Sequence, residues 1–178
     1  INPKLIQAYI NLGKILFDLD KVEEANFFEW NAIKLDPSFE FAKNYKENSK
    51  VINKIAFYVY SYTIFNHYKS VIEINTNLFE ILVPEDIDQK ILEKINNYFN
   101  DKEIIIRSTN ELIRNNLIYE TLVSNHGNDK VGFVSDKENV QLIKKVPIIQ
   151  LLGKKNIRFM YAAGKLQWNL SYWNKYYD

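Results

Sequence analysis

Residues 55–83 read IAFYVYSYTIFNHYKSVIEINTNLFEILV, and this stretch decides the fold class. Its first six residues are almost all β-branched or aromatic, as in a buried strand. Residues 66–74 then have apolar side chains at helical spacing, and residues 79–83 form a second apolar run. A strand, a helix and another strand in this order predict two parallel strands joined by a right-handed crossover.

The alternation continues through the rest of the chain. Apolar spacing predicts an amphipathic helix over residues 87–99 and a short helix over residues 110–116. Three more strands are expected, at residues 103–108, 118–123 and 157–162. Residues 127–155 are predicted to be a long connection. The fold class is therefore α/β, with a five-stranded, mostly parallel, Rossmann-like sheet flanked by helices.

Composition excludes several classes of function. The net charge is +1 without a basic stripe, so nucleic-acid binding is not expected. Cysteine is absent, which rules out disulfides and thiolate ligands, and the two histidines have no acidic cluster beside them, so no metal site is expected. No strand is followed by a glycine-rich phosphate fingerprint, so no cofactor is expected. The longest apolar run, residues 55–65, is too short for a transmembrane segment of about 20 residues.

The N-terminal residues show a repeat. The strings INPKL at residues 1–5 and LDPSF at residues 35–39 place Pro3 and Pro37 34 positions apart. Between them, Gly13 and Ala25 stand where two antiparallel helices would approach closely, and Ala32 stands where the first helix of the next repeat would dock. One face of the first helix is expected to carry Tyr9, Leu12, Gly13 and Leu16. An ordinary helical hairpin is the open alternative.

These residues and their spacing resemble the tetratricopeptide repeat (TPR) family over residues 1–37. The resemblance implies a groove that binds a protein partner. The INP string at the start looks like the tail of an earlier repeat, so the native protein is expected to continue upstream. Residues 39–51 are predicted to form a capping helix. We therefore expect an all-α TPR segment over residues 1–52 and an α/β domain over residues 53–178.

Polar residues follow several of the predicted strands, where ligands bind in open parallel sheets. The candidate substrate-binding residues are Ser61, Asn66, His67, Ser124, Asn125, Gly164 and Lys165. His126 is the candidate catalytic residue, because a histidine can act as a general base near neutral pH. A locally hydrogen-bonded loop histidine is the alternative for His126 and for His67, and a surface lysine is the alternative for Lys165.

Three motifs in the second part of the chain resemble a known enzyme family. They are VSNH at residues 123–126, NIRFMYAAGK at residues 156–165, and WN at 173–174 running to YD at 177–178. Residues 54–178 resemble the N-terminal half of bacterial two-domain transferases of the CDP-glycerol glycerophosphotransferase-like group, which have the GT-B architecture.

This resemblance implies that the α/β domain holds the acceptor of a glycosyl or glycerophosphoryl group. The nucleotide-activated donor would bind mostly to a C-terminal domain expected beyond Asp178. The implied location is the cytoplasm or the inner face of the membrane.

The chain departs from this family at one position. A His-Gly pair is usual after the fifth strand, whereas this chain has Ala163-Gly164 followed by Lys165. The usual base is therefore missing there, which puts activity through that residue in doubt. A non-catalytic, TPR-containing interaction scaffold and another GT-B-like enzyme, such as a sugar epimerase, remain open alternatives.

Overall fold

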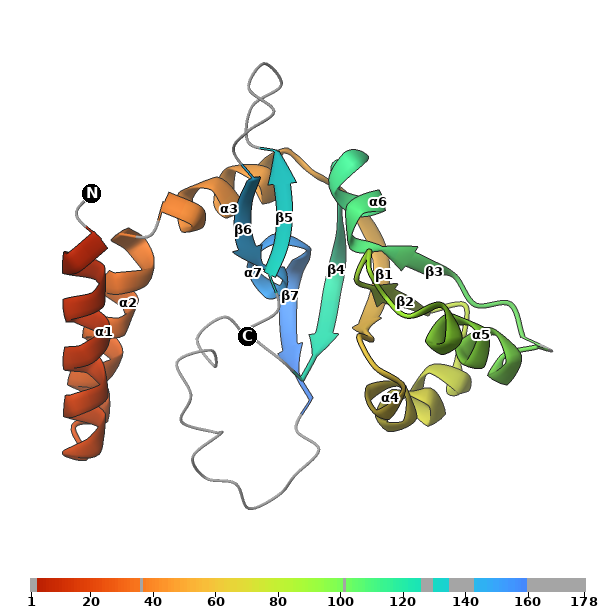
Figure 1. Cartoon of the computed structure of the whole chain (residues 1–178), viewed down its shortest axis with the longest axis horizontal. Coiled ribbons are helices and arrows are strands. Elements are labelled where there is room, and N and C mark those ends of the chain that lie inside the picture. The colour runs from red at the N-terminus through yellow and green to blue at the C-terminus, as the bar shows by residue number, and fades with distance from the viewer. Residues whose placement is uncertain (1–2, 36, 101, 126–129, 135–142, 160–178) are drawn as a thin grey trace. The chain divides into compact units, whose positions relative to one another are not determined.

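The computed structural model describes residues 3–35, 37–100, 102–125, 130–134 and 143–159 (Figure 1). The chain divides into two compact units, Ile1–Asn44 and Tyr45–Asp178. The described residues of the first unit are helices joined by short turns, and all described strands belong to the second unit. The TPR and acceptor-domain identities predicted for residues 1–52 and 53–178 stay predictions.

The first unit contains a helical hairpin. Helix α1 (Pro3–Asp18) and helix α2 (Val22–Leu35) pack against each other, and helix α3 (Pro37–Asn48) follows. Both repeated prolines stand at the first position of a helix, where the missing N–H costs no hydrogen bond. Between α1 and α2, Asp20 turns the chain with a positive φ of 60°. An aspartate tolerates this left-handed conformation better than most residues.

Small side chains are buried in this hairpin, as the sequence predicts. Ala25 and Ala32 are almost fully buried, Gly13 is buried, and the rings of Tyr9 and Phe28 stack at 5.9 Å. Leu12 differs from the prediction, since it is 38% exposed and does not belong to the buried face. The reason is geometric: around the helix, Leu12 lies to one side of the buried positions Gly13 and Leu16, at the edge of the buried stripe.

The second unit is built around a five-stranded, all-parallel sheet, which confirms the predicted α/β class. The strands, in the order β3-β2-β1-β4-β7, are β3 (Ile106–Ser108), β2 (Phe79–Val83), β1 (Lys50–Tyr58), β4 (Leu117–Ser124) and β7 (Gly153–Arg158). The helices of this unit are α4 (Tyr62–Ile74), α5 (Gln89–Tyr98), α6 (Thr109–Arg114) and α7 (Ile148–Leu151). From β1 the chain adds β2 and then β3 on one side of the sheet, and it then returns to add β4 on the other side of β1. The strand order therefore reverses beside β1.

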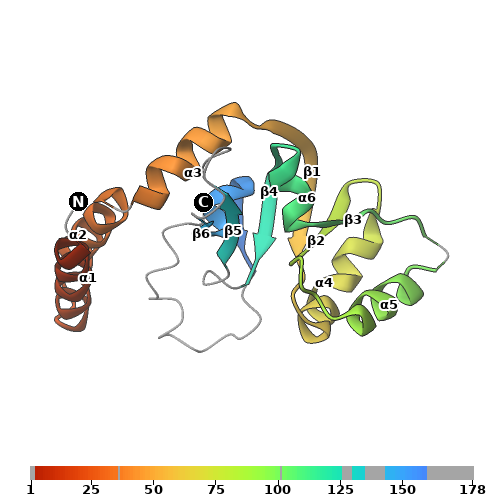
Figure 2. The same ribbon diagram turned by 45° about the horizontal axis from the view of Figure 1, so that its top comes forward.

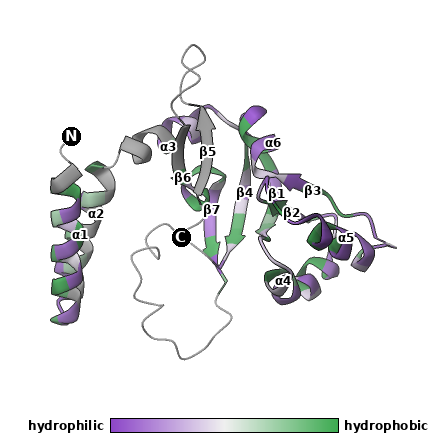
Figure 3. Cartoon of the chain, viewed as in Figure 1, coloured by the Kyte–Doolittle hydropathy of each residue, from purple (hydrophilic) through white to green (hydrophobic). Residues whose placement is uncertain are grey.

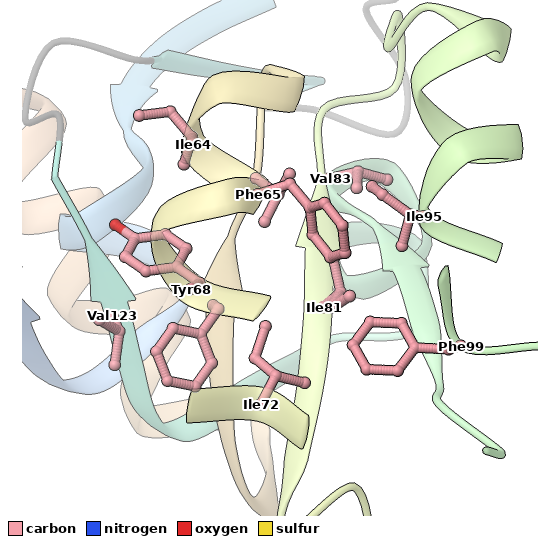
Figure 4. Close-up of a cluster of buried hydrophobic side chains, with 11 residues drawn as sticks. Ile64, Phe65, Tyr68, Ile72, Ile81, Val83, Ile95, Phe99 and Val123 are labelled. Carbon is pink, nitrogen blue, oxygen red and sulfur yellow. The ribbon is translucent and has the colours of Figure 1, made fainter. Parts of the chain in front are cut away.

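One face of the sheet is covered by α4 and α5, which lie beside each other in both ribbon views (Figures 1 and 2). The side chains that meet there are Phe57, Ile81, Val83 and Val123 from strands and Phe65, Tyr68, Ile72, Ile95 and Phe99 from the helical side (Figure 4). Phe57 contacts Tyr68 with ring centroids 5.1 Å apart. Burying each such side chain stabilises the fold by about 1.5–3 kcal/mol.

The opposite face is buried as well. Ala56, Leu82 and Leu122 alternate along their strands with the residues of the first face, and all three are fully buried. Hydrophobic residues accordingly lie next to one another in the carboxyl-terminal part of β4, whereas α5 alternates between hydrophilic and hydrophobic positions (Figure 3). Strands buried on both faces are typical of parallel sheets.

Two predicted strands begin earlier than expected. Strand β1 starts at Lys50 rather than Ile55, and β7 starts at Gly153 rather than Ile157. Because β1 starts early, the predicted capping helix ends at Asn48. The added residues are largely polar and exposed, so apolar patterning could not identify them. Their backbone groups pair with β4, where Lys50 lies opposite Leu117.

The predicted connection over residues 127–155 contains structure that the sequence analysis did not identify. Strands β5 (Lys130–Val134) and β6 (Ile143–Pro147) form an antiparallel pair, and α7 follows directly. The pair contacts α6 through β5 and α7 through β6. The missed strands are short and mix lysines with apolar residues, which gives no clear periodicity.

Asn116 joins the starts of the two central strands. Its backbone φ is 52°, its side-chain nitrogen donates to the Asn48 carbonyl at 2.7 Å, and its side-chain oxygen accepts from the Ser49 hydroxyl at 3.0 Å. Its carbonyl also accepts from the Lys50 N–H at 2.9 Å. One asparagine therefore combines a left-handed turn with side-chain bonds that start β1 beside β4.

We predict that Asn116→Ala lowers the free energy of unfolding by about 2 kcal/mol, from backbone strain and two lost side-chain hydrogen bonds. Asn116→Gly should cost only about 1 kcal/mol, because glycine accepts the positive φ. Urea unfolding followed by circular dichroism measures both. The control is Asn115→Ala, since Asn115 has an ordinary φ of −95° and its side chain makes one local hydrogen bond, to the Glu111 carbonyl. Equal losses for the Ala and Gly variants of Asn116 would contradict the role of its backbone.

Candidate functional site

The carboxyl end of the sheet at β1 and β4 is the candidate site. In open parallel sheets, ligands bind where the strand order reverses, because the connections on the two sides leave in opposite directions. Here β1 leads towards β2, whereas β4 leads towards β7 on the other side. The residues at this point are Val59, Tyr60 and Ser61 after β1, and Ser124 and Asn125 at the end of β4.

The end of β4 is held in place by its neighbours. Ser124 is fully buried, and its carbonyl accepts a hydrogen bond from the Phe159 N–H at 3.0 Å. The Phe159 ring meets the Tyr68 ring edge-to-face, with centroids 5.2 Å apart. The strand end is therefore tied both to β7 and to α4, which gives the site a rigid base.

Asn125 brings a buried polar side chain to this point. The residue is only 7% exposed, and its side-chain oxygen has no hydrogen-bond partner in the described part of the chain. A buried amide oxygen left without a donor costs about 1–3 kcal/mol. A ligand hydroxyl, an ammonium group or a water molecule that donates here would recover that free energy.

The predicted residues after β1 belong to α4. Ser61 caps this helix, and its hydroxyl oxygen accepts from the Ile64 N–H at 3.3 Å. Asn66 is exposed and His67 is half-buried in the following turn of α4. The Ser61 oxygen thus has a structural use, while substrate binding by Ser61, Asn66 and His67 stays a prediction. His126, Gly164 and Lys165 lie outside the described residues.

A cavity of about 380 Å³ opens beside this site, at the carboxyl ends of β1 and β2. It is lined by Tyr58, Tyr60, Pro84, Asp86, Ile87, Asp88 and Ile91. This cavity was not predicted from the sequence, although Pro84-Glu85-Asp86 directly after a buried strand marks a loop at the ligand-binding end of the sheet.

A second polar cluster lies inside the sheet. Glu80 of β2 is 3% exposed, and its carboxylate accepts from the Tyr119 hydroxyl at 2.8 Å and from the Arg107 Nε at 3.1 Å. Arg107 also pairs with Glu111 of α6. Burial, together with the charge of Glu80, raises the pKa of Tyr119 well above its usual value.

This cluster joins β2, β3, β4 and α6, and it spans β1, which lies between β2 and β4 in the sheet. It was missed by the sequence analysis, although one signal was present: Glu80 is the single charged residue in the apolar run of residues 79–83. Because Glu80 is the second residue of β2, the cluster lies away from the carboxyl ends, and we assign it a structural role.

Comparison with known proteins does not assign the site, since no family model, no curated protein and no solved structure matches this chain. None of the described helices is long and apolar enough to span a bilayer. Within the described ranges, no three acidic or histidine side chains gather into a group that could hold a metal ion.

The Tyr119 hydroxyl should give the fold a specific alkaline sensitivity. In the folded state its pKa is raised, so above about pH 10 the unfolded state loses a proton that the folded state keeps, and stability falls. We predict that wild type exceeds Tyr119→Phe in free energy of unfolding by about 1–2 kcal/mol at about pH 9. This advantage should shrink by about 1.4 kcal/mol at about pH 11. Urea titrations at both values measure it, and a difference that does not change with pH would refute the prediction.

Proposed function

We propose that the second unit binds a small polar acceptor at the carboxyl ends of β1 and β4, as the acceptor half of a transferase. The transferred group would be a glycosyl or glycerophosphoryl group from a nucleotide-activated donor. The observation that carries the binding site is the buried Asn125 oxygen, which lacks a partner among described residues at the point where the strand order reverses.

The choice of a transferase rests on the sequence motifs at residues 123–126 and 156–165, because a fold of this class supports many reactions. The polar donors of an acceptor, such as hydroxyl groups, suit the Asn125 oxygen. No glycine-rich phosphate loop is present in the sequence, so the donor nucleotide is assigned to a further domain. In this proposal the protein works in the cytoplasm or at the inner face of the membrane.

Each predicted residue has a role in this proposal. His126, one residue after Asn125, is the general base that takes the proton of the acceptor hydroxyl. Ser124, Asn125, Gly164 and Lys165 bind the acceptor, with Lys165 contacting an anionic group. The first turns of α4, which carry Ser61, Asn66 and His67, form the neighbouring wall.

A second candidate function is a non-catalytic interaction module. The observation that favours it is the apolar side of α1, where Leu5, Leu12 and Ile15 are 46%, 38% and 56% exposed. With the 34-residue spacing of Pro3 and Pro37, this hairpin supports a TPR-like segment that binds a protein partner. In that case the α/β unit would serve as a scaffold.

Acceptor binding can be tested on this chain by NMR titration with glycerol 3-phosphate and with N-acetylglucosamine. We expect the Asn125 side-chain amide signals to shift, and Asn125→Ala to weaken binding by about tenfold, which corresponds to one lost hydrogen bond. The matched control is Asn97→Ala, an exposed asparagine on α5, which should bind as wild type does. If neither compound binds, or if both variants lose the same affinity, the acceptor site is wrong and the interaction module is favoured.

The reaction class requires a protein that also carries the donor-binding domain. We predict release of CMP from CDP-glycerol, or of UDP from UDP-glucose, that depends on the acceptor. His126→Ala should lower kcat by about 10²–10⁴-fold with little change in acceptor affinity, as expected for loss of a general base. Nucleotide release that is unchanged in this variant would exclude His126 as the base.

A further inference from the structure

The cavity between the carboxyl ends of β1 and β2 has walls of a distinctive chemistry. Tyr60 contributes a half-buried aromatic ring, and the Tyr58 ring, only 3% exposed, packs beside it with the two centroids 5.8 Å apart. Pro84, Ile87 and Ile91 contribute apolar surface. A volume of about 380 Å³ lies within the usual size range of small-molecule sites. The cavity therefore has room and apolar contact area for a compact organic group.

The charged residues of the cavity are all acidic. Asp86 and Asp88 line it, and both are exposed. Asp88 caps α5 by accepting from the Lys90 N–H at 2.8 Å, which uses one of its two carboxylate oxygens. Throughout the described ranges, neither aspartate pairs with a basic side chain. The nearby Lys94 ammonium lies over the Tyr62 ring instead, 4.8 Å from its centroid.

These charges are not neutralised by the backbone either. The N-terminus of α5 carries a partial positive charge of about half an elementary charge, whereas the two carboxylates contribute about two negative charges. The residues that line the cavity therefore carry a net negative charge. Phosphorylated compounds are disfavoured there, and a cation gains from both the carboxylates and the Tyr60 ring.

We propose that this cavity, lined by Tyr58, Tyr60, Asp86 and Asp88, binds a small organic cation such as a primary or quaternary ammonium compound. The site lies at β1 and β2 and goes beyond the acceptor site proposed at β1 and β4. Apolar substituents of the cation contact Ile87 and Ile91, and its charge interacts with the two carboxylates and the Tyr60 ring. Neutral sugars could stack on the same rings, but they leave the carboxylates without a counterion.

The proposal is tested with a pair of probes that differ only in charge. Choline carries a quaternary ammonium group, and 3,3-dimethylbutan-1-ol has the same shape with a neutral carbon in its place. We expect NMR titration of the full chain to show choline shifting the amide signals of residues 84–91 with at least tenfold higher affinity than the neutral alcohol. Choline binding should also weaken as salt is added, because exposed charges are screened.

Substitutions then identify the groups responsible. Asp86→Asn and Asp88→Asn each remove a charge, and asparagine preserves the cap of α5. Each should weaken choline binding about three- to fivefold, and Tyr60→Leu should weaken it about fivefold. Glu85→Gln is the matched control, since Glu85 is also exposed and is adjacent in sequence but does not line the cavity. It should change affinity by less than about twofold.

Three results would overturn the proposal. They are equal affinity for choline and its neutral isostere, an equal loss of choline affinity in Glu85→Gln and Asp86→Asn, and stronger binding of glucose than of choline. Dispersed amide spectra establish that each variant is folded before its affinity is compared. Since Asn125 is not part of this cavity, failure of the acceptor site leaves these outcomes unchanged.

Discussion

The packing of α4 onto β1 is the interaction on which the second unit depends. Phe57, in the middle strand of the sheet, lies against Tyr68, and Phe65 packs in turn against Phe99 at the end of α5. A parallel sheet cannot stand alone, because both faces are apolar and each must be covered. The helices that follow β1 and β2 supply that cover on one face, and their positions fix where the strands end.

A buried charge is placed within this apolar framework. Glu80 would be costly on its own, but Arg107 and the Tyr119 hydroxyl satisfy its carboxylate, and Arg107 also pairs with Glu111. Breaking such a group leaves an uncompensated charge in the core, so its members constrain one another. The cluster thereby fixes the register of strands that are not neighbours in the sheet, and it does so away from the candidate site.

The carboxyl end of the sheet consequently presents two chemically different surfaces. At the end of β4, a neutral amide oxygen is buried on a rigid base. Beside the end of β2, two tyrosines and two exposed aspartates line an acidic, aromatic cavity. In the two proposals, the first surface suits a hydroxyl donor and the second suits a cation, so the carboxyl end of one sheet distinguishes the two by hydrogen bonding and by charge.

The sequence by itself determined the five parallel strands and most of the helices, because alternation of buried strands with amphipathic helices is a local property of the chain. It also placed Ser124 and Asn125 at a strand end. The polar first halves of β1 and β7 and the β5–β6 pair were missed, since their pairing depends on backbone groups of other segments. Only the tertiary structure brought Glu80 into contact with Tyr119 and Arg107. Those contacts join residues far apart in the chain, and side-chain periodicity carries no information about which distant partner a polar group will meet.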